Sequence, residues 1–373
     1  MSPAADTTRR LRWRQGATVF RLELGRVLLS RRRLWVYVLA LAPVLLIALF
    51  ATRQRIDANQ RETLSAATRP GLTAAAFASI QPGMSEAEVL HRLGPAPQRD
   101  QFNLRRRGPR DHITYADFTR LHYGAGGVEY TISLLRHVVR DTSRSQGQSL
   151  SDEQLVLGTL FQFFTIRLVV FFGCLGIFMN LFRGELLDRS LHFYFLAPVR
   201  REVVMAGKFA AGLAGAVVIF VGSMVLQLAL LGWQIGPSAR AEFLAVNHGW
   251  AQIGAYLGVT VLGCIGYGAF FLAAGMLTKN PIVPAAALLI WESINPFLPS
   301  LLRHISVIYY LTALAPVTAA SQPGTPALIA LLASGPGAIE PVWAVLGLLA
   351  VAAVLVWLAG LRVRRLEIDY SSD

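Results

Sequence analysis

Two ionisable side chains stand inside long apolar runs of the sequence, where a charge is uncommon. Arg167 lies near the middle of the run 155–182, and Glu292 interrupts the run 282–302. A charge at bilayer depth costs about 2.5–3.5 kcal/mol on insertion scales, so such a group usually faces protein or water and serves a function. These positions predict a functional polar site at Arg167 and Glu292, with Gln162 as a weaker candidate. The alternative interpretation is that Arg167 extends toward the membrane interface and that Glu292 marks the end of a short span.

Other arrangements of reactive residues do not occur in the sequence. The histidines are scattered over different segments, and no spacing typical of a metal site or an activated nucleophile is found. A phosphate-binding P-loop needs Gly-Lys followed by Ser or Thr, whereas the only two lysines, Lys208 and Lys279, are followed by Phe and Asn. The sequence therefore predicts a non-catalytic chain that holds no cofactor or metal and does not hydrolyse ATP by that route.

A charged, aromatic and proline-containing segment from Phe182 to Lys208 separates two of the apolar runs. Its apolar side chains recur at i, i+4, i+7 and i+8, which is one face of a helix, at Leu187, Leu191, Tyr194 and Phe195. The charged residues lie off this stripe, and Pro198 ends it. The pattern predicts a short helix over 185–196 with a surface suited to a soluble partner. The alternative is a loop whose basic residues follow membrane topology and whose aromatic rings lie among lipid headgroups.

The composition indicates what kind of chain positions these residues. Of 373 residues, 54% are hydrophobic and only 15% are charged, and the mean hydropathy is +0.48. These values favour a polytopic α-helical membrane protein. The net charge of +13 comes from basic residues beside the apolar runs, a pattern typical of membrane topology and not of nucleic-acid binding. Cys174 and Cys264 both lie in apolar runs, so no disulfide framework is predicted.

Six apolar runs approach the roughly 20 residues that a helix needs to cross a bilayer. They are 34–51, 155–182, 209–233, 250–276, 282–302 and 342–361. The fifth run is the least regular, because Glu292, Pro296 and Pro299 interrupt it and favour an early end or a kink. The broken stretch 303–341 predicts a re-entrant or interfacial segment on the outer side of the membrane.

Arginine-rich segments predict the orientation of these spans. With six spans, the N-terminal segment 1–33, the segment after the second span and the C-terminal end, including the tail 366–373, share one side and carry most of the basic residues near the spans. The positive-inside rule then makes both termini cytoplasmic. Within the N-terminal segment, apolar residues recur at helical spacing at Phe20, Leu24, Val27 and Leu28. They predict an amphipathic helix on the cytoplasmic interface, with an ordinary N-terminal extension as the alternative.

Residues 52–154 form a polar insert between the first two spans, and their local signals predict a folded α+β periplasmic domain. A helix is expected over Met84–Leu93, because Ser85 and Glu88 have the spacing of a capping box. A strand is expected over Val128–Leu134, where apolar and polar residues alternate. The Gly-rich stretch before that strand, 123–127, predicts a hairpin turn.

The segment after the second span resembles a known family. Glu185, the Arg189-Ser190-Leu191 step, the run "LAPVRREV" and Gly207-Lys208 are similar to the corresponding segment of ABC-2-type transporter permeases. Ser190 departs mildly from the Thr that is common there. The six predicted spans, the N-terminal helix and the broken segment before the last span look like the same family, so the resemblance covers nearly the whole chain except the insert.

This resemblance implies roles for several candidate residues. The segment would carry the coupling helix that docks on a separate ATPase subunit, which would bind ATP and Mg²⁺. The coupling residues implied are Glu185, Asp188, Arg189, Leu191, Phe195, Pro198 and Arg200. Spans two and five border the dimer interface and the translocation path in that family, so Arg167, Glu292 and Gln162 become candidates for lining that path.

The insert has a resemblance of its own. The run "IQPGMSEAEVLHRLGPAP", Ile80 to Pro97, looks like the opening of the SmpA/OmlA (BamE-like) periplasmic domain. Permeases of the ABC-2 type have a short loop at this place, so the substrate is not transferable by analogy. The insert implies a periplasmic protein or the substrate as a further partner.

Together these features predict the membrane subunit of an ATP-driven exporter in the bacterial inner membrane. It would work by alternating access, as a homodimer or with a related permease, in contact with lipid and without nucleic acid. The alternative from another class is a non-transporting scaffold that presents the BamE-like domain. A scaffold has no need of a docking helix, so the segment 182–208 discriminates between the two.

Overall fold

The computed structural model describes residues 3–30, 34–107, 113–145, 150–187, 201–234, 237–245, 248–278, 280, 282–316 and 339–364. The chain divides into two compact units. Unit 1 comprises Met1–Ala48 and Leu150–Asp373, and unit 2 comprises Leu49–Ser149.

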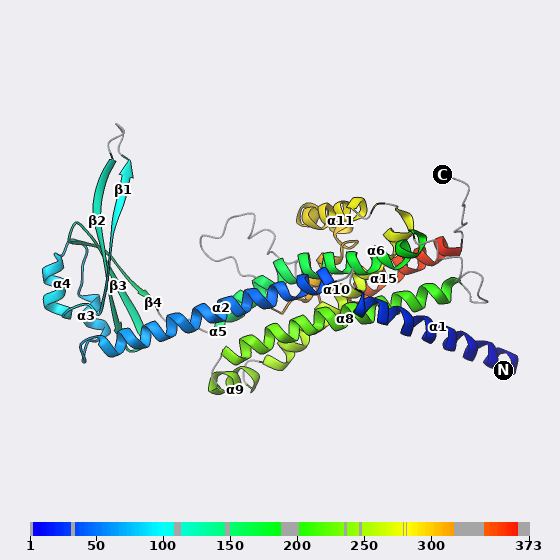
Figure 1. Cartoon of the computed structure of the whole chain (residues 1–373), viewed down its shortest axis with the longest axis horizontal. Helices are drawn as coiled ribbons and strands as arrows, with labels where there is room; N and C mark the ends of the chain where they lie inside the picture. Colours follow the sequence, from blue (N-terminus) through cyan, green and yellow to red (C-terminus); the bar gives the residue numbers. More distant parts are fainter. Residues whose placement is uncertain are drawn as a thin grey trace. The chain divides into compact units, whose positions relative to one another are not determined.

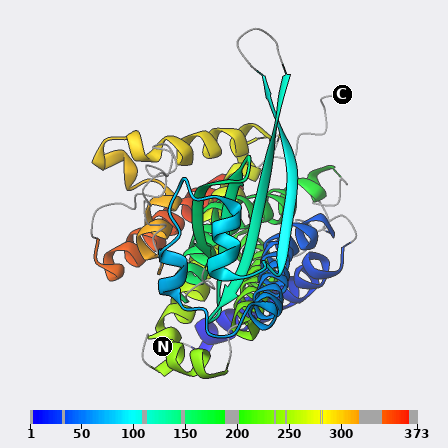
Figure 2. The same ribbon diagram turned by 90° about the vertical axis from the view of Figure 1, so that its left-hand side faces the viewer.

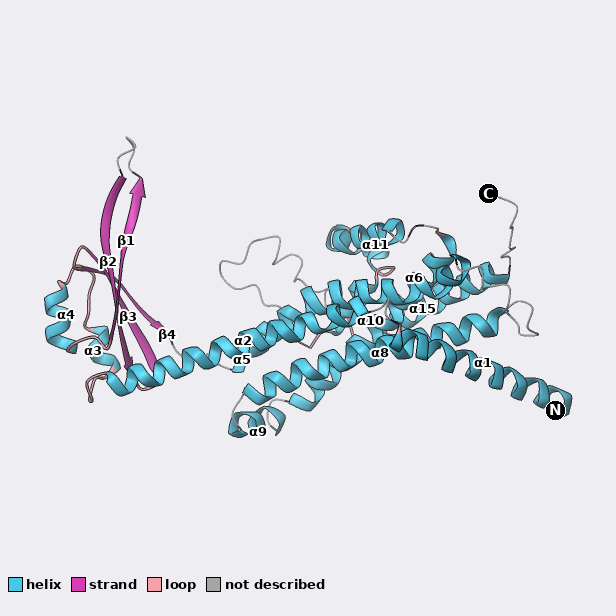
Figure 3. Cartoon of the chain, viewed as in Figure 1, coloured by secondary structure: helices cyan, strands magenta, loops and turns pink. Residues whose placement is uncertain are grey.

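Unit 1 is helical throughout its described part (Figures 1 and 3). In chain order its elements are α1 (Pro3–Leu29), the first part of α2 (Leu34–Ala67), α5 (Leu150–Thr159), the π-helix η2 (Leu160–Val170), α6 (Phe171–Leu187), α8 (Arg201–Gln234), α9 (Pro237–Ala245), α10 (Gly249–Leu277), α11 (Ile282–Ile294), the 3-10 turn η3 (Asn295–Phe297), α12 (Ser300–Arg303), α13 (Val307–Leu314) and α15 (Pro341–Arg364).

Five helices of the described residues are long and apolar enough to cross a membrane. They are Leu34–Ala67, Gln154–Met179, Glu202–Gln234, Gly249–Leu277 and Pro341–Val363. They correspond to five of the six predicted runs, and the chain is accordingly a membrane-embedded helical protein. The α10 helix lies at the centre of the bundle. In its most apolar 18-residue stretch 67% is buried inside the protein, compared with 22% for the same measure in α2 and in α15.

The fifth predicted run, 282–302, does not form a spanning helix. Its α11 has 13 residues, which is about 20 Å of helix, whereas the hydrocarbon core of a bilayer is about 30 Å thick. The α11 helix ends at Ile294. It is followed by η3, which contains Pro296, and by the short α12, which begins directly after Pro299. The early end that these prolines favour is therefore observed, and a total of six spanning helices is not confirmed.

Unit 2 is a small α+β unit with a four-stranded antiparallel sheet in the order β1-β2-β3-β4. The strands are β1 (Gln98–Arg107), β2 (Ile113–Ala125), β3 (Val128–Leu135) and β4 (Val138–Ser145), and the helices are α3 (Ala74–Ala78) and α4 (Glu86–Leu93). Figure 2 looks onto this unit, with α3 and α4 beside the strands. Its core joins helix and sheet residues, at Phe77, Ile80, Val89, Leu93, Leu121, Tyr123, Ile132, Leu134 and Val139.

The local signals in unit 2 are confirmed. The side chain of Ser85 accepts a hydrogen bond from the Glu88 amide at 3.3 Å, and Glu88 accepts one from the Ser85 amide at 2.9 Å, so the capping box is complete. Gly126 and Gly127 connect β2 to β3 with φ values of 59° and 78°. These positive values are the conformation that a two-residue hairpin turn requires and that glycine adopts without strain.

Tyr123 is the largest side chain in the centre of this core. It is fully buried, and its hydroxyl donates a hydrogen bond to the Gly94 carbonyl at 3.0 Å. Burial, with a smaller contribution from the charge of Glu86, raises the pKa of Tyr123 to about 12. The phenol therefore stays neutral, and its hydrogen bond ties the end of α4 to the sheet.

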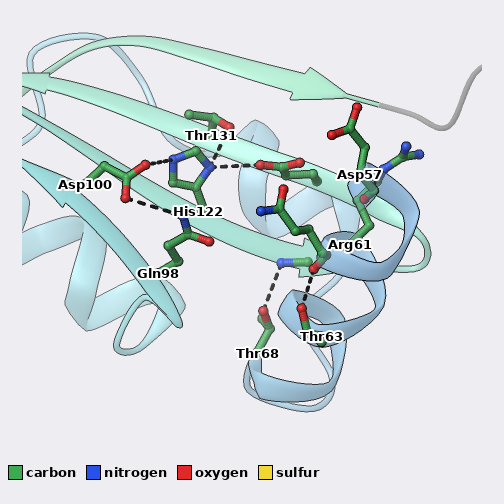
Figure 4. A network of polar contacts seen from close by, with 11 residues as sticks. Asp57, Arg61, Thr63, Thr68, Gln98, Asp100, His122 and Thr131 are labelled. Carbon is green, nitrogen blue, oxygen red and sulfur yellow. Dashed lines mark hydrogen bonds and ion pairs between the residues drawn. The ribbon is translucent and has the colours of Figure 1, made fainter. Parts of the chain in front are cut away.

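The last turns of α2 pack against the sheet at Gly124. A Cβ at this position would lie 2.4 Å from the Ser65 backbone nitrogen, and the Gly124 amide donates to the Thr68 hydroxyl at 2.9 Å. Figure 4 shows Thr68 at this contact. It also shows His122 of β2, whose Nε2 lies 3.3 Å from a carboxylate oxygen of Asp100 and whose Nδ1 lies 2.8 Å from one of Glu129. Glycine is therefore required sterically for this close approach of two backbones.

Candidate membrane site

Glu292 closes a sharp turn between α11 and α13. Its side chain is 4% exposed and accepts three hydrogen bonds, from the Ser306 hydroxyl at 2.6 Å, the Val307 amide at 3.1 Å and the Ile308 amide at 2.9 Å. The first amides of a helix have no partner within the helix, and a carboxylate there is favoured by the helix dipole. Glu292 therefore caps α13 and holds it against the end of α11.

The rest of the turn satisfies its own backbone groups. The Arg303 guanidinium donates to the carbonyls of Pro296 at 2.6 Å and Leu298 at 2.7 Å. The Tyr310 hydroxyl donates to the His304 carbonyl at 2.8 Å. Irregular backbone is tolerated at membrane depth only where protein or water satisfies it. The α11–α13 pair, a helical hairpin closed by Glu292, thus satisfies these backbone groups within the protein.

The α13 helix is buried against the bundle. Its residues Val307 to Leu311 are all buried, and it packs on α10 and α15. Close approach is possible because α10 and α15 present glycines there, with a Cβ at Gly266 falling 2.7 Å from Val307 and one at Gly347 falling 2.6 Å from Tyr310. The α13 helix is consequently part of the core of unit 1.

Arg167 and Gln162 lie on η2, the π-helical middle of the second predicted span. Gln162 is 3% exposed, and the Arg167 guanidinium lies 5.7 Å from the centre of the Phe163 ring, within cation–π range. π-Helical segments are rare and frequently occur at functional sites. The two predicted polar residues therefore share a segment of unusual backbone.

The structure brings Arg167 and Glu292 into one region without joining them directly. The η2 segment that carries Arg167 contacts α13, whose start Glu292 caps, but among the described residues no ion pair connects the two side chains. The oxygens of Glu292 are occupied by the start of α13. Pairing of the two groups is not observed, and their role in a translocation path stays a prediction.

A second buried polar site joins α1, α6 and α8. Lys208 of α8 is 1% exposed, and its Nζ lies 3.0 Å from Glu23 of α1. The same Nζ donates to the Leu181 carbonyl of α6 at 3.2 Å. A buried charge is costly unless it is paired and hydrogen-bonded, and both conditions are met here.

Sequence reasoning singled out Lys208 but missed its partner. Glu23 lies between Val19 and Val27 on the buried stripe of α1, at i+4 and i−4. A single carboxylate inside an otherwise apolar helical stripe is the signal that could have found it. The predicted N-terminal helix is thus seen as α1, packed along α8, and its placement on a membrane interface stays a prediction.

Most of the predicted coupling residues lie outside the described part of the chain. Glu185 lies in the last turn of α6. Outside the described residues are Asp188, Arg189, Leu191, Phe195, Pro198 and Arg200, as well as residues 317–338 of the predicted outer segment. The short helix over 185–196 therefore stays a prediction.

Metal ligands and thiols are the remaining groups that could carry chemistry. Among the residues that the structure describes, no cluster of three His, Cys, Asp or Glu side chains is arranged to hold a metal ion. Cys174 and Cys264 are buried free thiols.

No match was found to any family model, curated protein or solved structure. The fold by itself defines a membrane-embedded helical protein with a small antiparallel α+β unit.

Proposed function

We propose that this chain is the membrane-spanning permease subunit of an ATP-driven exporter similar to the ABC-2 type. The observation that carries the proposal is the arrangement around Lys208. This residue lies at the end of the segment that resembles a coupling region, and it is bonded to both α1 and α6. A force applied at 182–208 would act directly on three helices.

The proposed mechanism is alternating access powered by a separate ATPase. ATP would close the ATPase dimer, and residues 185–196 would pass the movement to α6 and α8. The η2 segment, with Arg167 and Gln162, would adjust most easily, because π-helical turns lack the regular i to i+4 bonding of an α-helix. The hairpin closed by Glu292 would border the path as a rigid wall.

The proposed setting is the bacterial inner membrane, with both termini cytoplasmic and unit 2 periplasmic. Because five spanning helices alone would put the termini on opposite sides, this orientation requires the segment from α11 to α13 to add a sixth crossing. The support is the one-sided arginine distribution. A cysteine introduced at Ser143 should react with an impermeant thiol reagent from outside, and one introduced at Ser372 should not. The opposite labelling pattern would reject this orientation.

The decisive experiment is purification of the tagged full-length chain from its native membrane. We expect co-purification of a second chain that contains a P-loop, and ATP hydrolysis by the complex but not by this chain alone. Glu185→Arg and Leu191→Asp should each reduce recovery of that chain by about tenfold or more, since an interfacial charge reversal or a buried charge costs several kcal/mol.

Glu242→Arg is the matched control, because Glu242 is exposed on α9, far along the chain from the proposed docking segment. It should leave recovery and activity unchanged. Recovery of no P-loop chain, together with other proteins bound through unit 2, would instead favour the scaffold. Normal recovery with both docking variants would mean that 182–208 does not contact the ATPase.

A further inference from the structure

A cavity of about 450 Å³ lies in unit 1 where α8 ends and α10 begins. Its walls come from α5, α8, α9 and α10, and Figure 1 shows α9 beside the end of α8. The volume falls in the range of roughly 300–1,000 Å³ typical of small-molecule sites. None of the residues discussed above at Arg167, Glu292 or Lys208 lines it.

The walls are mainly aliphatic and aromatic. They include Leu157, Leu228, Leu231, Phe243, Ile253 and Leu257. Such a lining favours a hydrocarbon chain, because burial of apolar surface is worth roughly 25 cal/mol per Å². The cavity is therefore unsuited to a strongly polar solute.

Arg240 is the one cation among the described residues that line this cavity, which also include the polar side chains of Gln154 and Gln252. It lies on α9, is exposed, and forms no ion pair or hydrogen bond with the described residues. A guanidinium is well matched to the oxygens of a phosphate, which it can bind in a bidentate manner. The combination of apolar walls and one available cation fits an anionic amphiphile.

Two further residues place the cavity near a membrane interface. Trp250 lines it and is 70% exposed, and Trp233 at the end of α8 is 66% exposed. Exposed tryptophans at the ends of spanning helices are typical of headgroup depth. Deeper in, Tyr256 is 3% exposed, and its hydroxyl has no hydrogen-bond partner among the described residues.

We propose that this cavity binds an anionic phospholipid of the surrounding membrane, with an acyl chain against the apolar walls and the phosphate at Arg240. A soluble ligand would have to reach a cavity formed by spanning helices, whereas a lipid is already present at that depth. A zwitterionic lipid would bring its own headgroup cation close to Arg240, so its phosphate would bind there less favourably. The inference does not depend on transport and holds equally for a scaffold.

Gly232 offers a way to fill the cavity without disturbing its walls. It lines the cavity, and a Cβ built on it meets no heavy atom within 4 Å. Gly222, on the same helix, also has nothing within 4 Å of its Cβ but does not line the cavity. Gly232→Phe is therefore the test variant, and Gly222→Phe is its matched control.

The measurement is native mass spectrometry of the full-length chain in detergent, titrated with dioleoyl phosphatidylglycerol or dioleoyl phosphatidylcholine. The wild-type chain should retain one phosphatidylglycerol more tightly than phosphatidylcholine. Gly232→Phe should weaken phosphatidylglycerol binding about tenfold or more, and Gly222→Phe should match the wild type. Equal binding by Gly232→Phe and the wild type would overturn the site.

The charge is tested separately. Arg240→Gln should remove about a fivefold preference for phosphatidylglycerol, as expected for one basic residue near an anionic headgroup, and Arg240→Lys should restore part of it. Arg362→Gln, at an exposed position near the end of α15, should keep the preference. A wild-type chain that does not discriminate between the two lipids, or a preference that survives in Arg240→Gln, would show ordinary lipid contact and reject the proposal.

Discussion

Unit 2 and unit 1 differ in how deeply they bury charge. In unit 2 each described ion pair keeps at least one member partly exposed, as in Arg99 with Glu86, where 42% of the Arg99 side chain is exposed. In unit 1 the pair of Glu23 with Lys208 buries both members, with side chains 4% and 1% exposed. Water solvates the polar surface of a domain such as unit 2, whereas in a bilayer a polar side chain must find a protein partner. Among the described residues, the ion pair with both members fully buried accordingly lies in the membrane unit.

The largest expected effect comes from breaking the Glu23–Lys208 pair. Lys208→Met should lower the free energy of unfolding by about 3 kcal/mol, because it leaves a buried carboxylate without its main partner. The double variant Glu23→Leu with Lys208→Met should recover much of this loss. Thermal unfolding in detergent measures both variants, with exposed Arg21→Met as the control. Equal destabilisation of the single and double variants would mean that the two charges are not coupled.

Removal of the Glu292 carboxylate should have the next largest effect. Glu292→Ala leaves three buried donors unsatisfied, which costs about 3 kcal/mol in total at the lower limit of roughly 1 kcal/mol for each donor. Glu292→Gln keeps one acceptor oxygen and should cost less. Hydrogen exchange at the start of α13 should rise in the Ala variant and stay low in Glu242→Ala. If exchange at α13 is unchanged, Glu292 does not cap that helix.

Within unit 2, the close contact at Gly124 should be the most sensitive steric position. Gly124→Val places side-chain atoms against the Ser65 backbone, and overpacking of this kind costs about 2 kcal/mol. Limited proteolysis of unit 2 in the full chain should accelerate. Thr142→Val, at an exposed position of β4, should leave the rate unchanged. A stable Gly124→Val variant would show that α2 moves away from the sheet at little cost.

The smallest effect is expected at the capping box. Ser85→Ala should destabilise α4 by about 1 kcal/mol, measured as faster hydrogen exchange of the α4 amides. Ser79→Ala is a control, since Ser79 follows α3 and is exposed.

The capping box also predicts a pH dependence. Hydrogen bonds from the Ser85 amide and hydroxyl hold the pKa of Glu88 below its ordinary value. A lowered folded-state pKa gives stability that is present above the unfolded-state pKa and is lost as the pH falls through the folded-state pKa. Protection of α4 should therefore decrease in acid, and this decrease should be smaller in Ser85→Ala. Identical pH profiles for the two proteins would contradict the assignment.

The sequence by itself determined the membrane class, the five long apolar helices and, in unit 2, the helix at Ser85 and the turn before β3. Apolar runs of about 20 residues identify spanning helices because the bilayer admits few alternatives. The helix at Ser85 and the turn at Gly126–Gly127 were likewise predictable, since their signals act between residues a few positions apart.

The tertiary structure decided the partners of the buried charges. Glu292 was predicted as a functional residue and turned out to cap α13, at Ser306 to Ile308. Glu23 was overlooked and turned out to meet Lys208, 185 positions away. No periodicity encodes such pairs, because they depend on which faces of two helices meet, and that is settled only when the whole bundle packs.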